Sequence, residues 1–145
     1  MPNWCLNEVR VHFPDKETRD EFLTYCEGTR RETMKTSPEP DDMIDQMVHV
    51  TIEFNKIIPK PSDEKMDDVG DELDWNVDNW GTKWEPDIIT FDREDDTTVY
   101  WEMYTAWAPP TGIYDKLMDD WEDKGVLISW FYREDGMQFA GFLPH

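Results

Sequence analysis

The chain has 145 residues, enough for one domain with a hydrophobic core. It contains 34 aspartates and glutamates against 14 lysines and arginines, which gives a formal net charge of −20. This balance argues against binding to nucleic acid or to an anionic membrane surface, because phosphate contacts need clustered lysines and arginines. It favours a basic partner, a cation, or solubility through charge.

Aromatic residues and cysteines narrow the class further. The 8 tryptophans, 7 phenylalanines and 5 tyrosines argue against a disordered chain, since disordered segments are poor in aromatics. Cys5 and Cys26 form neither a CxxC pair nor a zinc pattern, so we expect reduced thiols. Without a recognisable signal peptide or an apolar run near the roughly 18 residues of a membrane span, we expect a cytoplasmic protein.

The start of the chain predicts a strand, a helix and an irregular insertion. Residues 7–13 alternate polar and apolar side chains, as a half-buried strand does. A helix is expected next, opened by Asp15 and ended by Gly28. Residues 29–42 hold two prolines and many polar side chains, which are typical of a loop. We therefore expect a mobile insertion at residues 29–47.

The middle of the chain predicts another strand, an acidic loop and a hairpin. Residues 48–58 carry alternating apolar side chains and predict the strand. Residues 62–86 are acidic and rich in tryptophan, and we expect a loop there with one or two helical turns at 69–79. Residues 88–91 and 99–107 predict two strands joined by a turn.

The end of the chain predicts a second helix and a closing hairpin. Residues 111–124 have apolar side chains at helical spacing, and Gly125 is suited to end that helix. Residues 127–132 and 137–142 predict the hairpin. This order of elements predicts an α+β fold in a single domain over residues 1–145. We expect a ferredoxin-like antiparallel sheet with two helices packed on one face.

The tryptophans of the acidic loop are the first candidate site. Gly81 permits a tight turn among them, and their indoles could stack on a base or a sugar. The same indoles could instead anchor an irregular loop to the core, and we favour that role because a long loop needs such anchors. The candidate ligand pocket consists of Trp75, Trp80, Trp84 and Trp107.

A calcium site is the second candidate, with the spacing of an EF-hand loop. Its ligands would be Asp74, Asn76, Asp78, the carbonyl of Trp80, Thr82 and Glu85. Asn79 stands where this loop needs glycine, and Pro86 disfavours the helix that should follow. We therefore expect no metal and no other cofactor.

Enzymatic chemistry is not predicted. The sequence contains no P-loop, no GxSxG and no HExxH motif, and no histidine is placed to activate Cys5. We expect a protein without catalytic residues. A metal-dependent enzyme that uses the abundant carboxylates stays as an alternative.

Clustered acids are the most informative feature. Residues 63–78 hold eight acids and one lysine, and five more acids crowd the second predicted helix. Like charges four residues apart cost a helix roughly 0.2–0.5 kcal/mol per pair, and acids near a helix C-terminus oppose its dipole. We expect a partner-binding acidic face made of Asp63, Glu64, Asp67, Asp68, Asp71, Glu72, Asp115, Asp119, Asp120, Glu122 and Asp123.

Several motifs spread along the chain resemble the YubB-like ferredoxin-fold family of plasmid and bacteriophage proteins. They are MPNWC at 1–5, FNKIIPKP at 54–61, NWGTKW at 79–84 and TAWAPP at 105–110. The family usually has serine where this chain has Ala108 and methionine where it has Lys60. The resemblance implies the ferredoxin-like fold and an origin on a mobile element, but no reaction.

Acidity and the resemblance together lead to a functional hypothesis. We expect the protein to bind and inhibit a host nucleic-acid-handling or defence protein, such as a restriction, CRISPR or nuclease enzyme, in the bacterial cytoplasm. Its carboxylates would stand where DNA phosphates sit in a basic surface, so it would touch neither nucleic acid nor membrane itself. The alternatives are a small-ligand module that uses the tryptophans, and acidity that serves only solubility.

Overall fold

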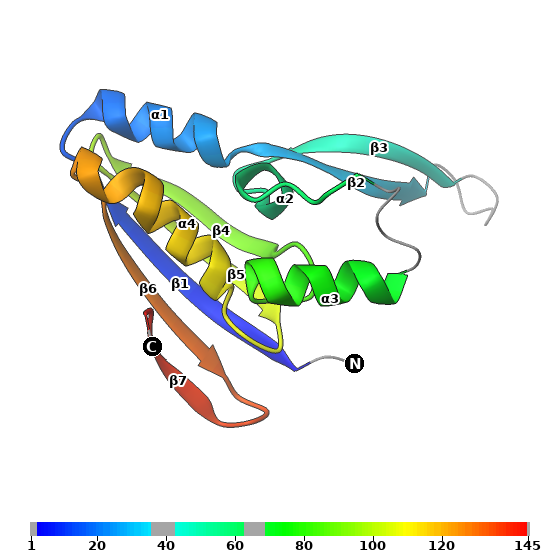
Figure 1. Cartoon of the computed structure of the whole chain (residues 1–145). Coiled ribbons are helices and arrows are strands. Elements are labelled where there is room, and N and C mark those ends of the chain that lie inside the picture. Colours follow the sequence, from blue (N-terminus) through cyan, green and yellow to red (C-terminus); the bar gives the residue numbers. More distant parts are fainter. Residues whose placement is uncertain (1–2, 36–42, 63–68, 145) are drawn as a thin grey trace.

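The computed structural model describes residues 3–35, 43–62 and 69–144, which form an α+β fold (Figure 1). The strands are β1 (Trp4–His12), β2 (Gly28–Lys35), β3 (Met43–Val50), β4 (Asp87–Asp95), β5 (Thr98–Ala106), β6 (Leu127–Glu134) and β7 (Phe139–Phe142). The helices are α1 (Lys16–Cys26), α2 (Phe54–Ile57), α3 (Val69–Trp80) and α4 (Thr111–Trp121). A 3-10 turn at Glu122–Lys124 follows α4.

Five strands form one antiparallel sheet in the order β4-β5-β1-β6-β7. The central strand is β1, and its Val9 lies opposite Trp101 of β5 and Trp130 of β6. All three side chains are buried on the same face. The alternation predicted for residues 7–13 is therefore confirmed, although the strand begins earlier, at Trp4.

Helices α1 and α4 lie across one face of this sheet (Figure 1). Phe22 of α1 meets Trp121 of α4 edge to face, with 5.2 Å between ring centroids, and lies 6.3 Å from Trp101 of the sheet. Burying a large apolar side chain stabilises a fold by roughly 1.5–3 kcal/mol. This packing fixes both helices and turns their other sides toward solvent.

Side-chain and glycine signals set the helix ends. The carboxylate of Asp15 accepts a 2.7 Å hydrogen bond from the backbone N–H of Thr18, which caps the start of α1. Gly125 has φ 82° and ends the turn after α4, a backbone conformation that glycine adopts without strain. Both predicted helices are confirmed, with the last residues of the second in 3-10 geometry.

The prediction of an irregular insertion at residues 29–47 is wrong for the residues that the structure describes, because these form strands. The strands β2 and β3 pair as a separate two-stranded sheet, with Gly28 opposite Val50, and this hairpin extends away from the main sheet (Figure 1). Backbone groups make the pairing, so a polar sequence can form strands whose faces meet solvent. Residues 36–42 lie outside the described residues.

The strand expected at 48–58 is also wrong beyond Val50, because Phe54–Ile57 is the helix α2. The carboxylate of Glu85 accepts hydrogen bonds from the backbone N–H groups of Phe54, at 2.6 Å, and Asn55, at 2.9 Å. These bonds cap the helix start. The segment expected as a loop at 62–86 is more regular than predicted, since α3 spans twelve of its residues.

The opposite face of the main sheet carries no helix in the described part of the chain (Figure 1). Large aromatic side chains lie on it among polar ones, and Trp4, Tyr104 and Phe142 are 41%, 36% and 62% exposed. The molecule therefore presents two unlike surfaces, one made by helices and one by the open sheet.

Candidate functional site

The acids predicted on the second helix lie on the outer side of α4 and of the turn after it. Asp115, Asp119, Glu122 and Asp123 are exposed. Asp120 is partly buried at the junction with α1. The apolar side chains of α4 are buried on the other side of the helix, which directs the acids toward solvent.

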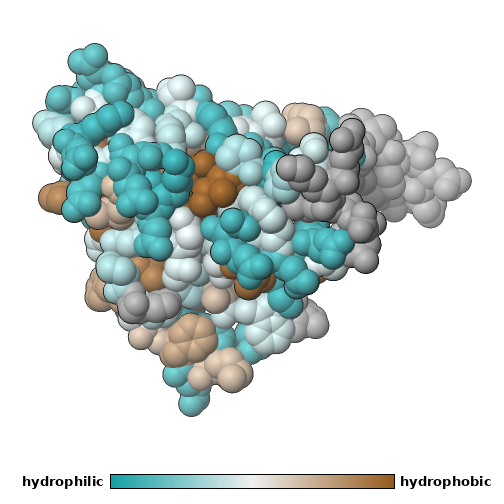
Figure 2. Space-filling model, in the orientation of Figure 1, coloured by the Kyte–Doolittle hydropathy of each residue, from teal (hydrophilic) through white to brown (hydrophobic). Residues whose placement is uncertain are grey.

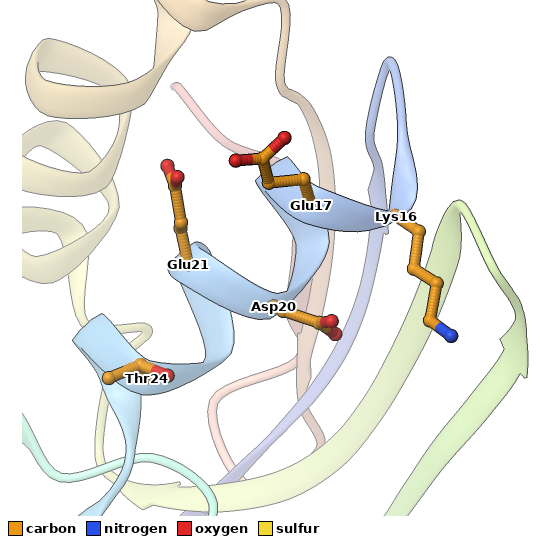
Figure 3. A pocket seen from close by; sticks show the side chains of 5 residues that line it. All are labelled: Lys16, Glu17, Asp20, Glu21 and Thr24. Atoms are coloured by element: carbon orange, nitrogen blue, oxygen red, sulfur yellow. The ribbon is translucent and has the colours of Figure 1, made fainter.

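Helix α1 adds carboxylates that the sequence-based reasoning missed. Glu17, Asp20 and Glu21, with Lys16 and Thr24, line an open groove of about 770 Å³ along the helix (Figure 3). Glu17 and Glu21 extend in the same direction from the helix (Figure 3). Their spacing of four residues was visible in the sequence and could have identified them, because such residues share one side of a helix.

A hydrogen bond joins the two helices within this surface. The hydroxyl of Tyr25 on α1 donates to the carboxylate of Asp120 on α4 at 2.5 Å, and its ring packs against Trp121. This bond, and then the ammonium of Lys116, hold the pKa of Asp120 below its ordinary value. Burial, and then Asp120, raise the pKa of Tyr25. At neutral pH the donor is therefore protonated and the acceptor ionised.

We call the combined carboxylates of α1, α4 and the following turn the acidic helix surface: Glu17, Asp20, Glu21, Asp115, Asp119, Asp120, Glu122 and Asp123. The same elements carry Lys16, Lys116, Lys124 and the buried Arg19. Arg19 pairs with Asp20 at 2.9 Å, and Lys116 pairs with Asp120 at 3.1 Å. Figure 2 shows many hydrophilic residues on this side, with hydrophobic patches among them. Eight carboxylates against four basic side chains leave negative charge in excess.

The acids predicted between residues 63 and 72 are only partly placed. Asp63, Glu64, Asp67 and Asp68 lie outside the described residues. Asp71 and Glu72 lie in the first turn of α3, where they favour the helix dipole. Glu72 pairs with Lys60 at 2.5 Å. Asp71 and Glu72 thus lie on a third helix and are not among the carboxylates of α1 and α4.

The four tryptophans of the candidate ligand pocket are divided among different contacts. Trp80 is fully buried, and its ring meets that of Trp75 at 6.0 Å. Trp84 instead meets Trp4, at 6.2 Å between centroids. Trp107 is 40% exposed, with the ammonium of Lys83 over its ring. Trp80 therefore anchors α3 in the core, and the four indoles do not line a shared pocket.

The calcium-loop interpretation is wrong, because its first ligands lie on a helix. Asp74, Asn76 and Asp78 belong to α3, whereas an EF-hand loop curls these positions around the ion. Asn76 is buried and donates to the carbonyl of Lys83, and Glu85 caps α2. Within the described ranges, no group of three or more histidine, cysteine or carboxylate side chains could hold a metal ion.

Both cysteines are free and buried in the core. Burial raises the pKa of the Cys5 thiol to about 11 and also raises the pKa of Cys26. The reactive form of cysteine is the thiolate, so both side chains act at neutral pH as small apolar residues.

Comparison with protein-family models, with curated proteins and with solved structures gives no match. Among the helices in the described part, none is long and apolar enough to cross a membrane. The strongest candidate site is therefore defined by geometry alone: a solvent-facing layer of two helices with an excess of carboxylates.

Proposed function

We propose that this protein is a ferredoxin-like binding protein whose acidic helix surface binds a basic, nucleic-acid-binding surface of another protein. The strand order supports the fold assignment. The strands β1, β4, β5 and β6 alternate with α1 and α4 as in a βαββαβ unit, and β1 and β5 occupy the centre. The hairpin β2–β3, α2 and α3 are then additions between α1 and β4, and β7 extends one edge.

One observation supports the binding function: six carboxylates of α1 and α4 and two of the turn after α4 lie on the solvent-facing side of the helix layer, at a cost in helix stability. Asp115, Asp119 and Asp123 follow one another at intervals of four residues, where each like-charge pair costs about 0.2–0.5 kcal/mol. Neither α1 nor α4 has a base in its last turn to balance the helix dipole. Stability alone favours lysines at these positions, so we infer a partner with the opposite charge.

Mimicry of a nucleic-acid backbone gives this surface a mechanism. Carboxylates along two neighbouring helices can take the positions that phosphates occupy in a basic groove. Binding would then release counterions from the partner and weaken as salt is added. Complementary charge would also speed the encounter of the two proteins.

The family resemblance supplies the class of partner. Proteins of the YubB-like family are carried by plasmids and bacteriophages, and such elements gain from disabling host restriction, CRISPR or nuclease enzymes. We propose that this protein acts in the cytoplasm of a bacterial host by occupying the nucleic-acid site of such an enzyme, without a reaction of its own.

Two variants of equal charge test this proposal. One neutralises three acids of the acidic helix surface (D115N, D119N and D123N), and the control neutralises three exposed acids of α3 and β4 (D74N, D78N and D92N). A basic protein captured from bacterial lysate with the unaltered chain is then titrated with each. Since exposed ion pairs contribute about 0.2–1 kcal/mol each, we expect about tenfold weaker binding by the first variant only.

Competition and salt separate the outcomes. Duplex DNA should compete with the protein for its partner, and added salt should weaken both complexes. Equal losses in the two variants would show that total charge matters and not this surface. Full binding by the D115N, D119N and D123N variant would contradict the proposal.

A further inference from the structure

A hollow of about 670 Å³ lies at the end of the main sheet where β1 begins and β5 and β6 end. Its walls include Asn3, Trp4, Asp87, Tyr104, Glu134 and Asp135. Strand register places Trp4 and Tyr104 on the open face of the sheet, away from α1 and α4. This hollow is therefore separate from the acidic helix surface.

Two aromatic side chains form one side of the hollow. The rings of Trp4 and Tyr104 lie 6.4 Å apart at an interplanar angle of 63°. Trp84 meets the indole of Trp4 at 6.2 Å and 66°, which holds Trp4 between two rings. Trp4 and Tyr104 nevertheless remain 41% and 36% exposed. Exposed aromatic side chains held in position are a usual feature of binding sites.

The other side of the hollow is fixed by the turn between β6 and β7. The buried carboxylate of Glu134 accepts hydrogen bonds from the backbone N–H groups of Gly136, at 2.5 Å, and Met137, at 2.8 Å. The side chain of Asn3 rests against Gly136, where a Cβ atom would approach its Cγ to 2.6 Å. Contacts within the protein thus hold both sides of the hollow in place without a ligand.

The charged side chains that line the hollow favour a positively charged ligand. Two exposed carboxylates, Asp87 and Asp135, lie in the lining, whereas the carboxylate of the buried Glu134 is already bonded to the turn; the lining residues include no lysine or arginine. Asp135 pairs with Arg133 at 3.1 Å, while Asp87 lies exposed opposite Tyr104 in the strand register. Carboxylates beside aromatic faces attract a cation and repel a phosphate. The hollow therefore disfavours nucleotides, although its rings could stack on a base.

We propose that this hollow binds the guanidinium group of an arginine side chain presented by a partner protein. A guanidinium is planar, stacks on aromatic faces and bonds carboxylates with two N–H groups at once. The same face of the sheet already holds such a contact, since the guanidinium of Arg10 lies 4.9 Å from the ring centre of Tyr100. This site is separate from the acidic helix surface, and its test does not require the partner proposed for that surface.

The test uses two short glycine peptides, one with a central arginine and one with citrulline, its uncharged isostere. Each is titrated into the ¹⁵N-labelled full chain, and the indole N–H signals of the eight tryptophans are followed by NMR. We expect the arginine peptide to shift the signal of Trp4, identified by its loss in Trp4→Ala. The citrulline peptide should bind at least about fivefold more weakly, because it lacks the charge.

Three variants locate the site. Asp87→Asn alters one exposed carboxylate without changing its shape, and Tyr104→Ala removes one aromatic wall. Each should weaken binding of the arginine peptide about threefold to tenfold. Trp107→Ala removes an indole of similar exposure, 40%, whose ring already lies under Lys83, and should leave binding unchanged.

The outcomes keep this proposal separate from the previous one. The D115N, D119N and D123N variant should bind the arginine peptide as the unaltered chain does. Equal binding of the citrulline peptide would overturn the proposal, as would a shift of Trp4 by adenosine monophosphate or glucose without one by the arginine peptide. No shift at millimolar peptide would also overturn it.

Discussion

Asn7 is fully buried in the middle of β1, where an apolar side chain would be expected. Its amide nitrogen donates to the backbone carbonyl of Cys5, at 3.1 Å, and to the hydroxyl of Thr105, at 2.9 Å. Its amide oxygen accepts from the indole N–H of Trp130 at 2.9 Å. One polar side chain thus satisfies groups on all three central strands.

Removing this side chain should destabilise the fold. In Asn7→Ala, the indole N–H of Trp130 loses its acceptor inside the core, and a buried unsatisfied group costs about 1–3 kcal/mol. The hydroxyl of Thr105 also loses the hydrogen bond from Asn7 but still donates to the carbonyl of Ala108 at 2.7 Å. We expect the free energy of unfolding to fall by about 3 kcal/mol, measured by urea denaturation. Asn79→Ala on the exposed side of α3 is the control and should change it by no more than about 0.5 kcal/mol. Similar losses in both variants would contradict the role of Asn7.

At the scale of elements, the bond between Tyr25 and Asp120 makes the contact of α1 with α4 sensitive to acid. The folded pKa of Asp120 lies below its ordinary value, so its contribution to stability is present above about pH 3.9 and is lost as the pH falls through the folded pKa. The two helices are therefore joined more firmly at neutral pH than in acid.

Tyr25→Phe tests this dependence. The variant lacks the donor, so the pKa of Asp120 returns toward its ordinary value. We expect the variant to be less stable than the unaltered chain at pH 7, and the difference to narrow as the pH falls below 4, followed by urea midpoints. Tyr100→Phe removes a hydroxyl from the open face of the sheet and should not reproduce this narrowing. If the difference in stability between Tyr25→Phe and the unaltered chain stayed constant with pH, the bond between Tyr25 and Asp120 would not be the source of the acid sensitivity.

The elements predicted from sequence are those whose signals are local. The alternation around Val9, the cap at Asp15 and the turn at Gly125 all act within a few residues, and each marks an element that the structure contains. The start of α2 depends on Glu85, which is about thirty residues away, so no local sequence pattern predicts this helix. The hairpin β2–β3 is polar, and its strands are recognised only once they pair.

The candidate site divides in the same way. The acids of α4 were identifiable because a helix was predicted there and their spacing places them together. Those of α1 needed only the same reasoning applied to Glu17 and Glu21. The hollow could not be predicted, since Trp4, Tyr104 and Asp87 are joined by strand register alone.

For the whole molecule, a net charge of −20 implies repulsion within the folded state. Raising sodium chloride from 10 to 300 mM shortens the screening length from about 30 Å to below 10 Å. We expect the melting temperature to rise by about 5 °C, measured by circular dichroism. Calcium chloride at equal ionic strength should give the same rise. A larger rise with calcium would indicate a bound ion and contradict the reassignment of Asp74, Asn76 and Asp78 to a helix.

The burial of Cys5 and Cys26 offers a way to observe both surfaces directly. The thiolate form of cysteine attacks maleimide reagents, and these two thiols are enclosed and protonated in the folded chain. A cysteine introduced at the exposed Thr24 would therefore be the single reactive position, with no need to replace the native ones. A fluorophore attached there would report when a partner covers the helices, while the indole of Trp4 reports independently on the hollow.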